Sequence, residues 1–284
     1  VNNTLTNLEF TAPSATVAST GTIQMVANDN DSRTGNDSET LSLNILADPD
    51  LSLAATQHLV SGVATAVSGI SVVGGGSGVV TAQLVVSGGS ISLTGNSLGA
   101  VAHSGEDRYT ITGTADGVNQ VLATLTFNGD SGVGSNASIQ FSVDLGNILL
   151  GNLSGTQAIE VHDAPTLTVP GTTPLATVGV PLGVDGITVN DIDDNSLPMT
   201  LTPASGSLSL TAAGAVAATT DSGSGVVTLI GTPADINSSL DTLRYTAVAG
   251  SATGTIAVSV DDSDSITSNA TSSWSLDLVA RPEL

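Results

Sequence analysis

Hydrophobic and polar positions alternate in short runs along most of the chain. The clearest stretch is 166–279, where eight such runs are separated by glycine, aspartate and serine. Alternation with a period of two is typical of half-buried β-strands, and seven or eight strands in about 117 residues are typical of an antiparallel β-sandwich. The predicted strands are 166–169, 186–190, 198–202, 207–210, 226–230, 243–246, 254–260 and 273–279.

One segment of this stretch follows a helical period instead. Ile236, Leu240 and Leu243 stand at positions i, i+4 and i+7, behind Asp235. This spacing predicts one or two turns of N-capped helix laid on the sandwich. The same pattern occurs twice more, as Val1, Leu5 and Leu8 and as Val118, Leu122 and Leu125.

The chain contains an internal repeat with a period of about 117 residues. The aromatic residue after each helical pattern recurs at intervals of 117 and 118, and a linker proline recurs at intervals of 116 and 117. Independent landmarks with one period indicate tandem modules: the C-terminal part of one module over 1–48, then complete modules over 49–164 and 165–284. The aromatic landmarks, which we expect to anchor the cores, are Phe10, Phe127 and Tyr245, and the prolines are Pro49, Pro165 and Pro282.

The first module lacks a counterpart of 165–235, which holds most of the strands. Two or three strands with a bare apolar face are marginal in water, and their open edges favour pairing. We therefore expect the sequence to be a piece of a longer array whose missing part lies before Val1. The apolar residues left without a partner sheet are Leu8, Phe10, Ile23, Met25, Leu41, Leu43 and Ile45.

Charge and composition exclude several classes of function. The chain has 26 acidic and 4 basic residues, a net charge of −22, and no cysteine. It can therefore form neither disulfides nor thiolate metal sites, and it repels the phosphate backbone of nucleic acids. The uncharged stretch 59–105 consists of valine and alanine runs broken by glycine and serine, which favours strands over a membrane-spanning helix. We expect no nucleic-acid binding and no membrane insertion.

The helical turn at 231–246, followed by the strand and acidic turn at 254–264, resembles the cadherin-like and immunoglobulin-like tandem repeats of giant bacterial surface adhesins and biofilm matrix proteins of the type-I-secreted kind. The resemblance covers essentially the whole chain. It implies an extracellular rod at the bacterial cell surface, often stiffened by calcium. The implied partners are neighbouring repeats of the same chain or other copies of it, and cell-surface glycans are a further candidate.

Acidic residues gather in the loops predicted for one pole of the last module, beside the linker that enters it. Carboxylates crowded together repel one another unless a cation bridges them, and calcium takes six to eight oxygen ligands. The alternative is that these acidic turns are simply solvated, because aspartate favours turns for backbone reasons. The candidate calcium ligands are Asp163, Asp191, Asp193, Asp194, Asp261, Asp262 and Asp264, with a weaker set of Asp29, Asp31, Asp48, Asp50 and Asp144 around the preceding modules.

Catalytic chemistry has little support in the sequence. The three histidines, His58, His103 and His162, fall at non-equivalent positions of the repeat, so no histidine cluster and no zinc site is expected. No GxSxG motif is present, and we expect that the protein is not an enzyme. Trp274, the only tryptophan, is expected to lie in the core.

These observations favour an extracellular structural or adhesive repeat region that forms a cation-stiffened rod, stalk or filament. Two alternatives remain open. One is a self-assembling surface-layer or matrix-fibre subunit, which ordered lateral contacts between copies would distinguish from a single-chain stalk. The other is a glycan-binding β-sandwich module, which exposed coplanar aromatic rings would support. The chain has only three phenylalanines, two tyrosines and one tryptophan for that purpose.

Overall fold

The computed structural model describes residues 9–12, 19–28, 30, 33, 35–46, 48–74, 78–105, 107–146, 151–220, 224–250, 252–263 and 266–281. The chain divides into two compact units. The first comprises Val1–Gln57, Ala64–Gly129 and Ser135–Ile159, and the second comprises His58–Val63, Asp130–Gly134 and Glu160–Leu284.

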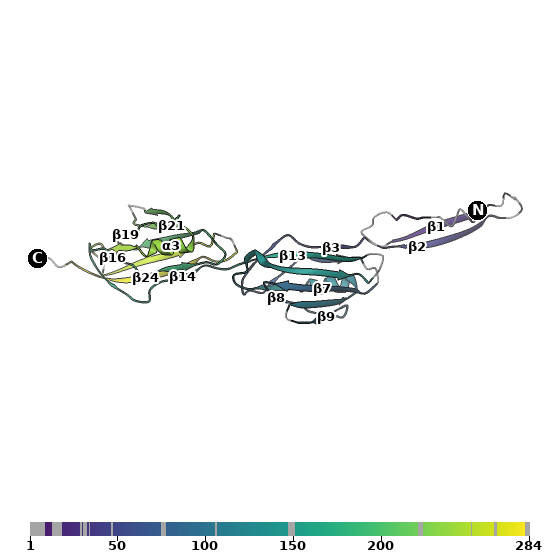
Figure 1. Cartoon of the computed structure of the whole chain (residues 1–284), viewed down its shortest axis with the longest axis horizontal. Helices are drawn as coiled ribbons and strands as arrows, with labels where there is room; N and C mark the ends of the chain where they lie inside the picture. The colour runs from purple at the N-terminus through teal and green to yellow at the C-terminus, as the bar shows by residue number, and fades with distance from the viewer. Residues whose placement is uncertain are drawn as a thin grey trace. The chain divides into compact units, whose positions relative to one another are not determined.

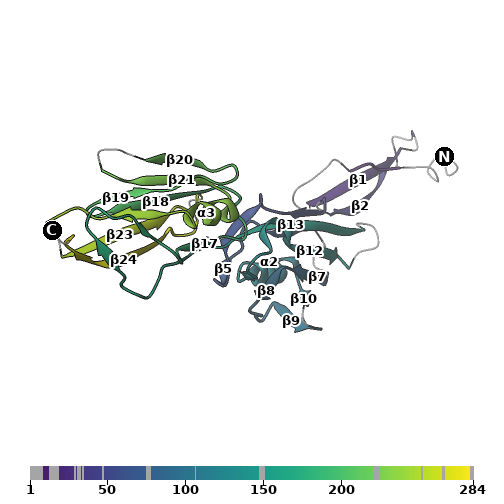
Figure 2. The same ribbon diagram turned by 60° about the vertical axis from the view of Figure 1, so that its left-hand side comes forward.

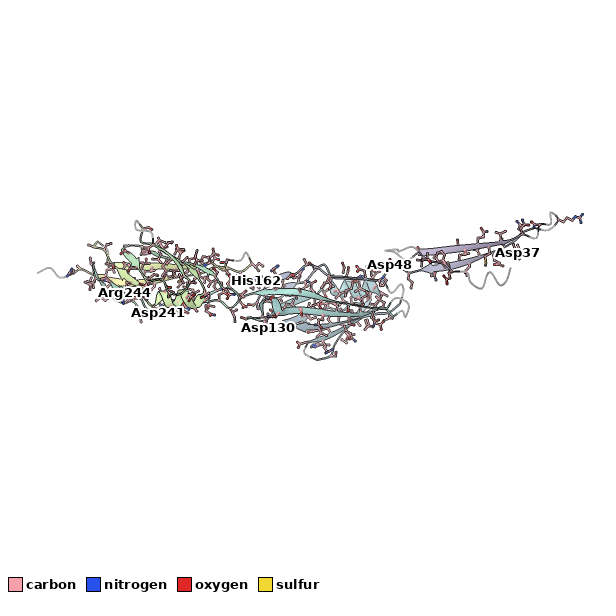
Figure 3. All side chains as sticks on the ribbon, turned by 45° about the horizontal axis from the view of Figure 1, so that its top comes forward. Asp37, Asp48, Asp130, His162, Asp241 and Arg244 are labelled. Carbon is pink, nitrogen blue, oxygen red and sulfur yellow. The ribbon has the colours of Figure 1, made fainter. Side chains whose placement is uncertain are left out.

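The first two strands form an antiparallel pair, β1 (Ser19–Ala27) and β2 (Asp37–Ile45). Figure 1 shows them side by side in purple, and Figure 3 shows Asp37 and Asp48 near the two ends of β2. Among the described residues, this pair makes a two-stranded sheet of its own.

Phe10 corrects a prediction made from the repeat. Its side chain is 51% exposed, whereas Phe127 and Tyr245 are fully buried. Met25 and Leu41 on β1 and β2 are also exposed. The reason is that, within the described part of the chain, the pair β1–β2 has no second layer against which to bury an apolar face.

The stretch from 50 to 162 forms a six-stranded sheet in the order β4-β13-β12-β7-β10-β9, a three-stranded sheet in the order β5-β11-β8, and the pair β3-β6 (Figure 1). Its elements are β3 (Asp50–Ser52), β4 (Gln57–Val60), β5 (Thr65–Ala66), β6 (Ser71–Val73), β7 (Val80–Ser87), β8 (Gly89–Ser92), β9 (Gly99–His103), β10 (Arg108–Gly113), α2 (Ala115–Leu122), β11 (Thr126–Gly129), η1 (Gly134–Asn136), β12 (Ala137–Asp144) and β13 (Asn152–His162).

The stretch from 166 to 279 repeats this arrangement strand for strand. The corresponding orders are β15-β24-β23-β18-β21-β20, β16-β22-β19 and β14-β17. Its elements are β14 (Thr166–Thr168), β15 (Leu175–Thr177), β16 (Leu182–Gly183), β17 (Thr188–Asn190), β18 (Leu197–Pro203), β19 (Ser207–Ser209), β20 (Ala217–Thr220), β21 (Val227–Gly231), α3 (Pro233–Leu240), β22 (Arg244–Thr246), β23 (Thr253–Val260) and β24 (Ala270–Val279).

Side chains from the six-stranded and three-stranded sheets share one core in this second stretch. Leu201 and Val258 come from the larger sheet, and Leu208 and Tyr245 come from the smaller one. The predicted all-β fold of tandem β-sandwich modules is confirmed, with one short helix in each of the two sandwiches. The helix predicted from Val1, Leu5 and Leu8 lies outside the described residues. All eight strands predicted in 166–279 are present, and the alternation missed only β15, β16 and β20, which have two to four residues each.

Each helix packs at an equivalent place on its sandwich, α2 against β10 and β6, and α3 against β17 and β21. Figure 2 shows both helices. The N-cap of α3 is Thr232, whose hydroxyl accepts a hydrogen bond from the Asp235 N–H at 3.2 Å. The helix therefore begins before Asp235, with Pro233 in its first turn. A proline is well suited to this place because the first helical N–H groups have no partner within the helix.

An asparagine on each helix binds the backbone of a neighbouring strand. The Asn237 amide accepts from the Val189 N–H at 2.9 Å and donates to the Val189 carbonyl at 2.8 Å. Asn119 makes the same two bonds with Val72. A side-chain amide carries one acceptor and two donors, so it can replace a strand partner at this point.

Replacing Asn237 by alanine is expected to destabilise the second sandwich by about 2 kcal/mol, because the buried Val189 peptide group loses both partners. Urea denaturation followed by far-UV circular dichroism measures the change. Asn237→Gln is the matched control, because it keeps the amide but moves it by one methylene. A loss below about 0.5 kcal/mol for the alanine variant would contradict this role.

Candidate functional site

The acidic loops of the second unit bring three carboxylates together. Asp191 and Asp194 follow β17, and Asp262 follows β23. One oxygen from each of the three lies within 4.8 Å of the others. The sequence predicted these residues as candidate calcium ligands on the assumption that the two loops share one pole of the sandwich.

These carboxylates are largely withdrawn from solvent. Asp262 is 1% exposed, and its N–H donates to the Asn269 side chain at 3.2 Å. Oδ1 of Asp191 accepts from the N–H groups of Asp193 and Asp194, at 3.2 and 3.4 Å. Among the described residues, Oδ2 of Asp191 and Oδ1 of Asp193 are buried without a hydrogen-bond partner. A buried carboxylate oxygen without a partner is costly, which makes this cluster favourable for a bound cation.

Asp193 lies next to this group, and its pKa reflects the crowding of carboxylates in the loop. Burial raises the pKa of Asp193, and the adjacent Asp191 carboxyl raises it further. The Asp163 N–H donates to Asp193 Oδ2 at 3.1 Å, which opposes the increase. Asp193 therefore connects the loop after β17 to the segment that follows β13.

The Asp163 side chain is not part of the group of three carboxylates and forms hydrogen bonds with other segments. Its Oδ1 accepts from the Ser61 hydroxyl at 2.6 Å, and its Oδ2 accepts from the Gly132 N–H at 2.7 Å. Burial raises the pKa of Asp163, but hydrogen bonds from Ser131, Ser61 and Gly132 outweigh burial and leave the pKa below its ordinary value. Within the second unit, Asp163 thus connects Ser61 and the 130–134 loop to the segment that precedes β14.

The remaining candidate ligands are not part of the group formed by Asp191, Asp194 and Asp262. Asp261 is exposed, and its carboxylate accepts from the Ser263 N–H at 3.2 Å. Asp48, Asp50 and Asp144 are exposed and, within the part of the chain that the structure describes, belong to no group of three metal-ligating side chains. Three further candidates lie outside the described residues: Asp29, Asp31 and Asp264.

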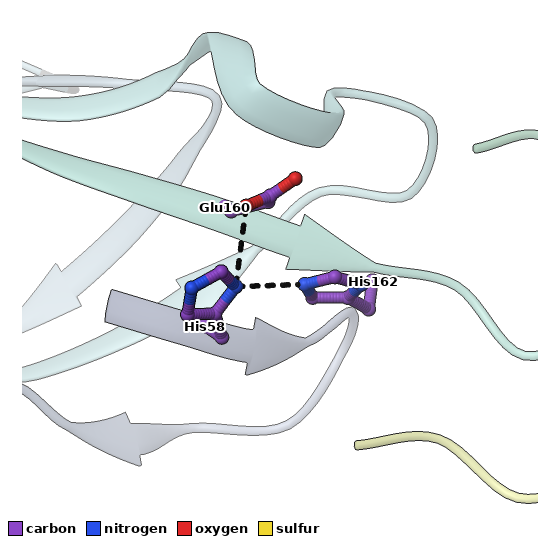
Figure 4. A group of neighbouring side chains, drawn as sticks. All are labelled: His58, Glu160 and His162. Atoms are coloured by element: carbon purple, nitrogen blue, oxygen red, sulfur yellow. Dashed lines mark hydrogen bonds and ion pairs between the residues drawn. The ribbon is translucent and has the colours of Figure 1, made fainter. Parts of the chain in front are cut away.

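A second cluster contradicts the expectation that the histidines are scattered. His58 on β4 and His162 at the end of β13 lie 3.1 Å apart, measured from Nδ1 to Nε2 (Figure 4). His58 Nδ1 is also 3.2 Å from Glu160 Oε2. The sequence could have indicated that Glu160 and His162 lie close together, because they are two residues apart and share one face of a strand. It did not indicate that β4 is the neighbour of β13.

The two clusters suit different ions. Carboxylate oxygens alone favour hard cations such as calcium, whereas imidazole nitrogens with one carboxylate favour zinc and similar transition metals. Among the described residues, no helix has the length and apolar composition needed to cross a membrane.

Comparisons with known proteins show only distant similarity. No protein-family model matches the chain, and no curated protein matches it. A three-domain structure from titin has a TM-score of 0.41 at 9% identity and covers 93% of this chain and 75% of its own. The first two domains of DIP-gamma have a TM-score of 0.37 at 11% identity, covering 81% and 97%. The protocadherin GammaB4 extracellular domain has a TM-score of 0.30 at 12% identity, covering 91% and 38%. With TM-scores this low, these similarities carry no argument about function, and the fold assignment rests on the strands themselves.

Proposed function

We propose that this chain is an extracellular structural or adhesive region of tandem β-sandwich modules, in which calcium at Asp191, Asp194 and Asp262 stiffens the start of the last module. The observation that carries the proposal is the convergence of these three carboxylates, with buried unpartnered oxygens on Asp191 and Asp193. The resemblance of 231–264 to bacterial surface repeats supports the setting of a rod at a bacterial cell surface. Its partners would be neighbouring repeats or other copies of the chain.

The spacing of the carboxylates suits calcium. Ca²⁺ binds oxygen at about 2.3–2.6 Å, so two ligands of one ion are separated by at most about 5 Å. The three oxygens lie within 4.8 Å of one another. Backbone carbonyls and water would complete the shell of six to eight ligands.

A mechanical role follows from the neighbours of the site. Asp193 binds the backbone of Asp163, and the Asp163 side chain binds Ser61 and Gly132. A cation that neutralises Asp191 and Asp194 would lower the repulsion within the Asp193 loop. The loop would then hold the segment between β13 and β14 more firmly, and bending of the chain at this point would cost more energy.

Calcium is expected to raise the thermal stability of the second unit. A ligand at one hundred times its Kd stabilises the folded state by about 2.7 kcal/mol. Differential scanning calorimetry with calcium and with EDTA measures the shift, and titration calorimetry measures the binding. An unchanged melting temperature together with no heat of binding would overturn the proposal.

Matched variants assign the effect to the cluster. Asp262→Asn should abolish the calcium-dependent shift. Asp277→Asn removes an equal charge but should retain the shift, because Asp277 pairs with Thr253 at the opposite end of β23. Thr253 and Val260 are seven residue steps apart along the strand, or roughly 23 Å. Equal loss in both variants would indicate an effect of net charge and not a site.

Glycan binding has no comparable support. Phe127, Phe141, Tyr245 and Trp274 are buried, and Tyr109 is half-buried. Phe10 is the one exposed aromatic side chain among the described residues, and a platform for sugar rings needs more than one exposed ring.

A further inference from the structure

We propose that His58, Glu160 and His162 form a binding site for a divalent transition-metal ion, with Zn²⁺ as its natural probe. All three residues belong to the second unit, and they come from two neighbouring strands, β4 and β13. Figure 4 shows the His58 ring facing both other side chains.

The β-sheet brings these side chains together. Glu160 and His162 are two residues apart on β13, so they point to the same face. The equivalent strands in the following repeat are β15 and β24, in which Leu175 pairs with Asp277. The Ser61 N–H donates to the His162 carbonyl, and the Val178 N–H donates to the Val279 carbonyl, so the two strand pairs are equivalent with a shift of 117 residues. This shift maps Leu175 onto His58 and Asp277 onto Glu160. His58 therefore stands opposite Glu160, with His162 one step further along the same face.

The separations of the donor atoms match a tetrahedral zinc site. Zinc binds histidine nitrogen at about 2.0–2.1 Å, which places two ligands of a regular tetrahedron about 3.3–3.4 Å apart. His58 Nδ1 lies 3.1 Å from His162 Nε2 and 3.2 Å from Glu160 Oε2. One donor atom from each residue lies within 4.8 Å of the others. Two of the three edges are thus within a few tenths of an ångström of the tetrahedral value, and the third is at most 4.8 Å.

A carboxylate lies on the side of the His162 ring that faces away from His58. A histidine that binds a metal through Nε2 carries its proton on Nδ1, which commonly faces a carboxylate. His162 Nδ1 lies 3.9 Å from Asp193 Oδ2. This distance is beyond hydrogen-bond range, so the carboxylate adds negative charge on the Nδ1 side of the ring and is not a ligand.

The site is accessible to ions from solution. The side chain of His58 is 47% exposed and that of Glu160 is 39% exposed, whereas that of His162 is 15% exposed. Three protein ligands leave the fourth tetrahedral position to water. Two imidazole nitrogens also distinguish this site from the all-carboxylate cluster, because calcium prefers oxygen ligands.

The next repeat provides an internal contrast. A shift of 117 residues places Leu175, Asp277 and Val279 where the first sandwich has His58, Glu160 and His162. Leu175 and Val279 are exposed apolar side chains and cannot bind a metal. The proposal therefore predicts one zinc site in this chain and not one in each module.

Titration of the chain with Zn²⁺ against a chromophoric chelator tests the proposal. We expect one tight equivalent and, with Co²⁺ in place of zinc, the visible absorption bands of a tetrahedral ion. His58→Ala and His162→Ala should each weaken binding by more than the roughly 10- to 100-fold that loss of an outer-shell partner costs. His103→Ala is the matched control: it removes a histidine that stacks on Tyr109, and it should leave zinc affinity unchanged.

Further variants separate this site from other sources of zinc affinity. If the double variant His58→Ala/His162→Ala binds zinc as tightly as the unaltered chain, zinc is held by carboxylates elsewhere and the proposal is wrong. If Asp262→Asn abolishes zinc binding while His58→Ala does not, the ion lies in the acidic cluster and the proposal is also wrong. Circular dichroism melting verifies that each variant is folded. The variant Leu175→His/Asp277→Glu/Val279→His should add a second equivalent.

Discussion

Replacing Trp274 by alanine is expected to lower the free energy of unfolding of the second sandwich by about 3–5 kcal/mol. The indole is 4% exposed and belongs to the core of that sandwich. Its Nε1 also donates to the Thr172 carbonyl at 2.8 Å. The substitution therefore creates a cavity and removes a hydrogen bond. Calorimetry and urea denaturation followed by circular dichroism measure the loss.

Trp274→Phe is the control that separates these two contributions. It retains an aromatic ring but leaves the Thr172 carbonyl without its donor, so we expect a loss of about 1–2 kcal/mol. Gln157, 117 residues earlier, supports the importance of the bond, because it is fully buried and donates to the Ala55 carbonyl at 3.0 Å. If Trp274→Ala cost less than Trp274→Phe, the packing contribution would be refuted.

The second large effect is expected at Gly117 in α2. A Cβ atom at this position would collide with the backbone carbonyl of Leu98. Backbone cannot move aside as a side chain can, so Gly117→Ala should destabilise the first sandwich by about 3 kcal/mol, at the upper end of the range for overpacking. This loss should exceed the gain of up to about 1 kcal/mol that alanine brings to a helix. Thermal unfolding and hydrogen exchange of α2 are the measurements.

Gly171→Ala is the matched control, because a Cβ atom there meets nothing within 4 Å. It should change stability by less than about 0.5 kcal/mol. The corresponding contact in the second sandwich is built differently, with a side chain and not backbone against the glycine. It has Asp235 at the position of Gly117, and the glycine is on the other side of the contact, at Gly214. A neutral Gly117→Ala would contradict the close approach of α2 to the 98–99 backbone.

The two candidate metal sites could be predicted from the sequence to different degrees. The acidic loops were evident, because runs of aspartate follow predicted strands and the sandwich brings those loops to one pole. Which carboxylates converge was not evident, because a turn can direct a side chain inward, as at Asp262, or outward, as at Asp261. The histidine cluster was missed, because His58 and His162 are 104 residues apart and meet only through the pairing of β4 with β13.

The sequence by itself determined the all-β fold, the period of the repeat, the strands of the last module, the short helices and the burial of Phe127, Tyr245 and Trp274. These features follow from periods of two and about 3.6 in a single segment, which local geometry converts directly into strands and helices. Only the tertiary structure decided that Phe10 is exposed, that Asn119 and Asn237 bind neighbouring strands, and that His58 meets Glu160 and His162. Each of these depends on which strand lies beside which and on whether a second layer is present. The contacts join segments far apart in the chain, and no local pattern encodes them.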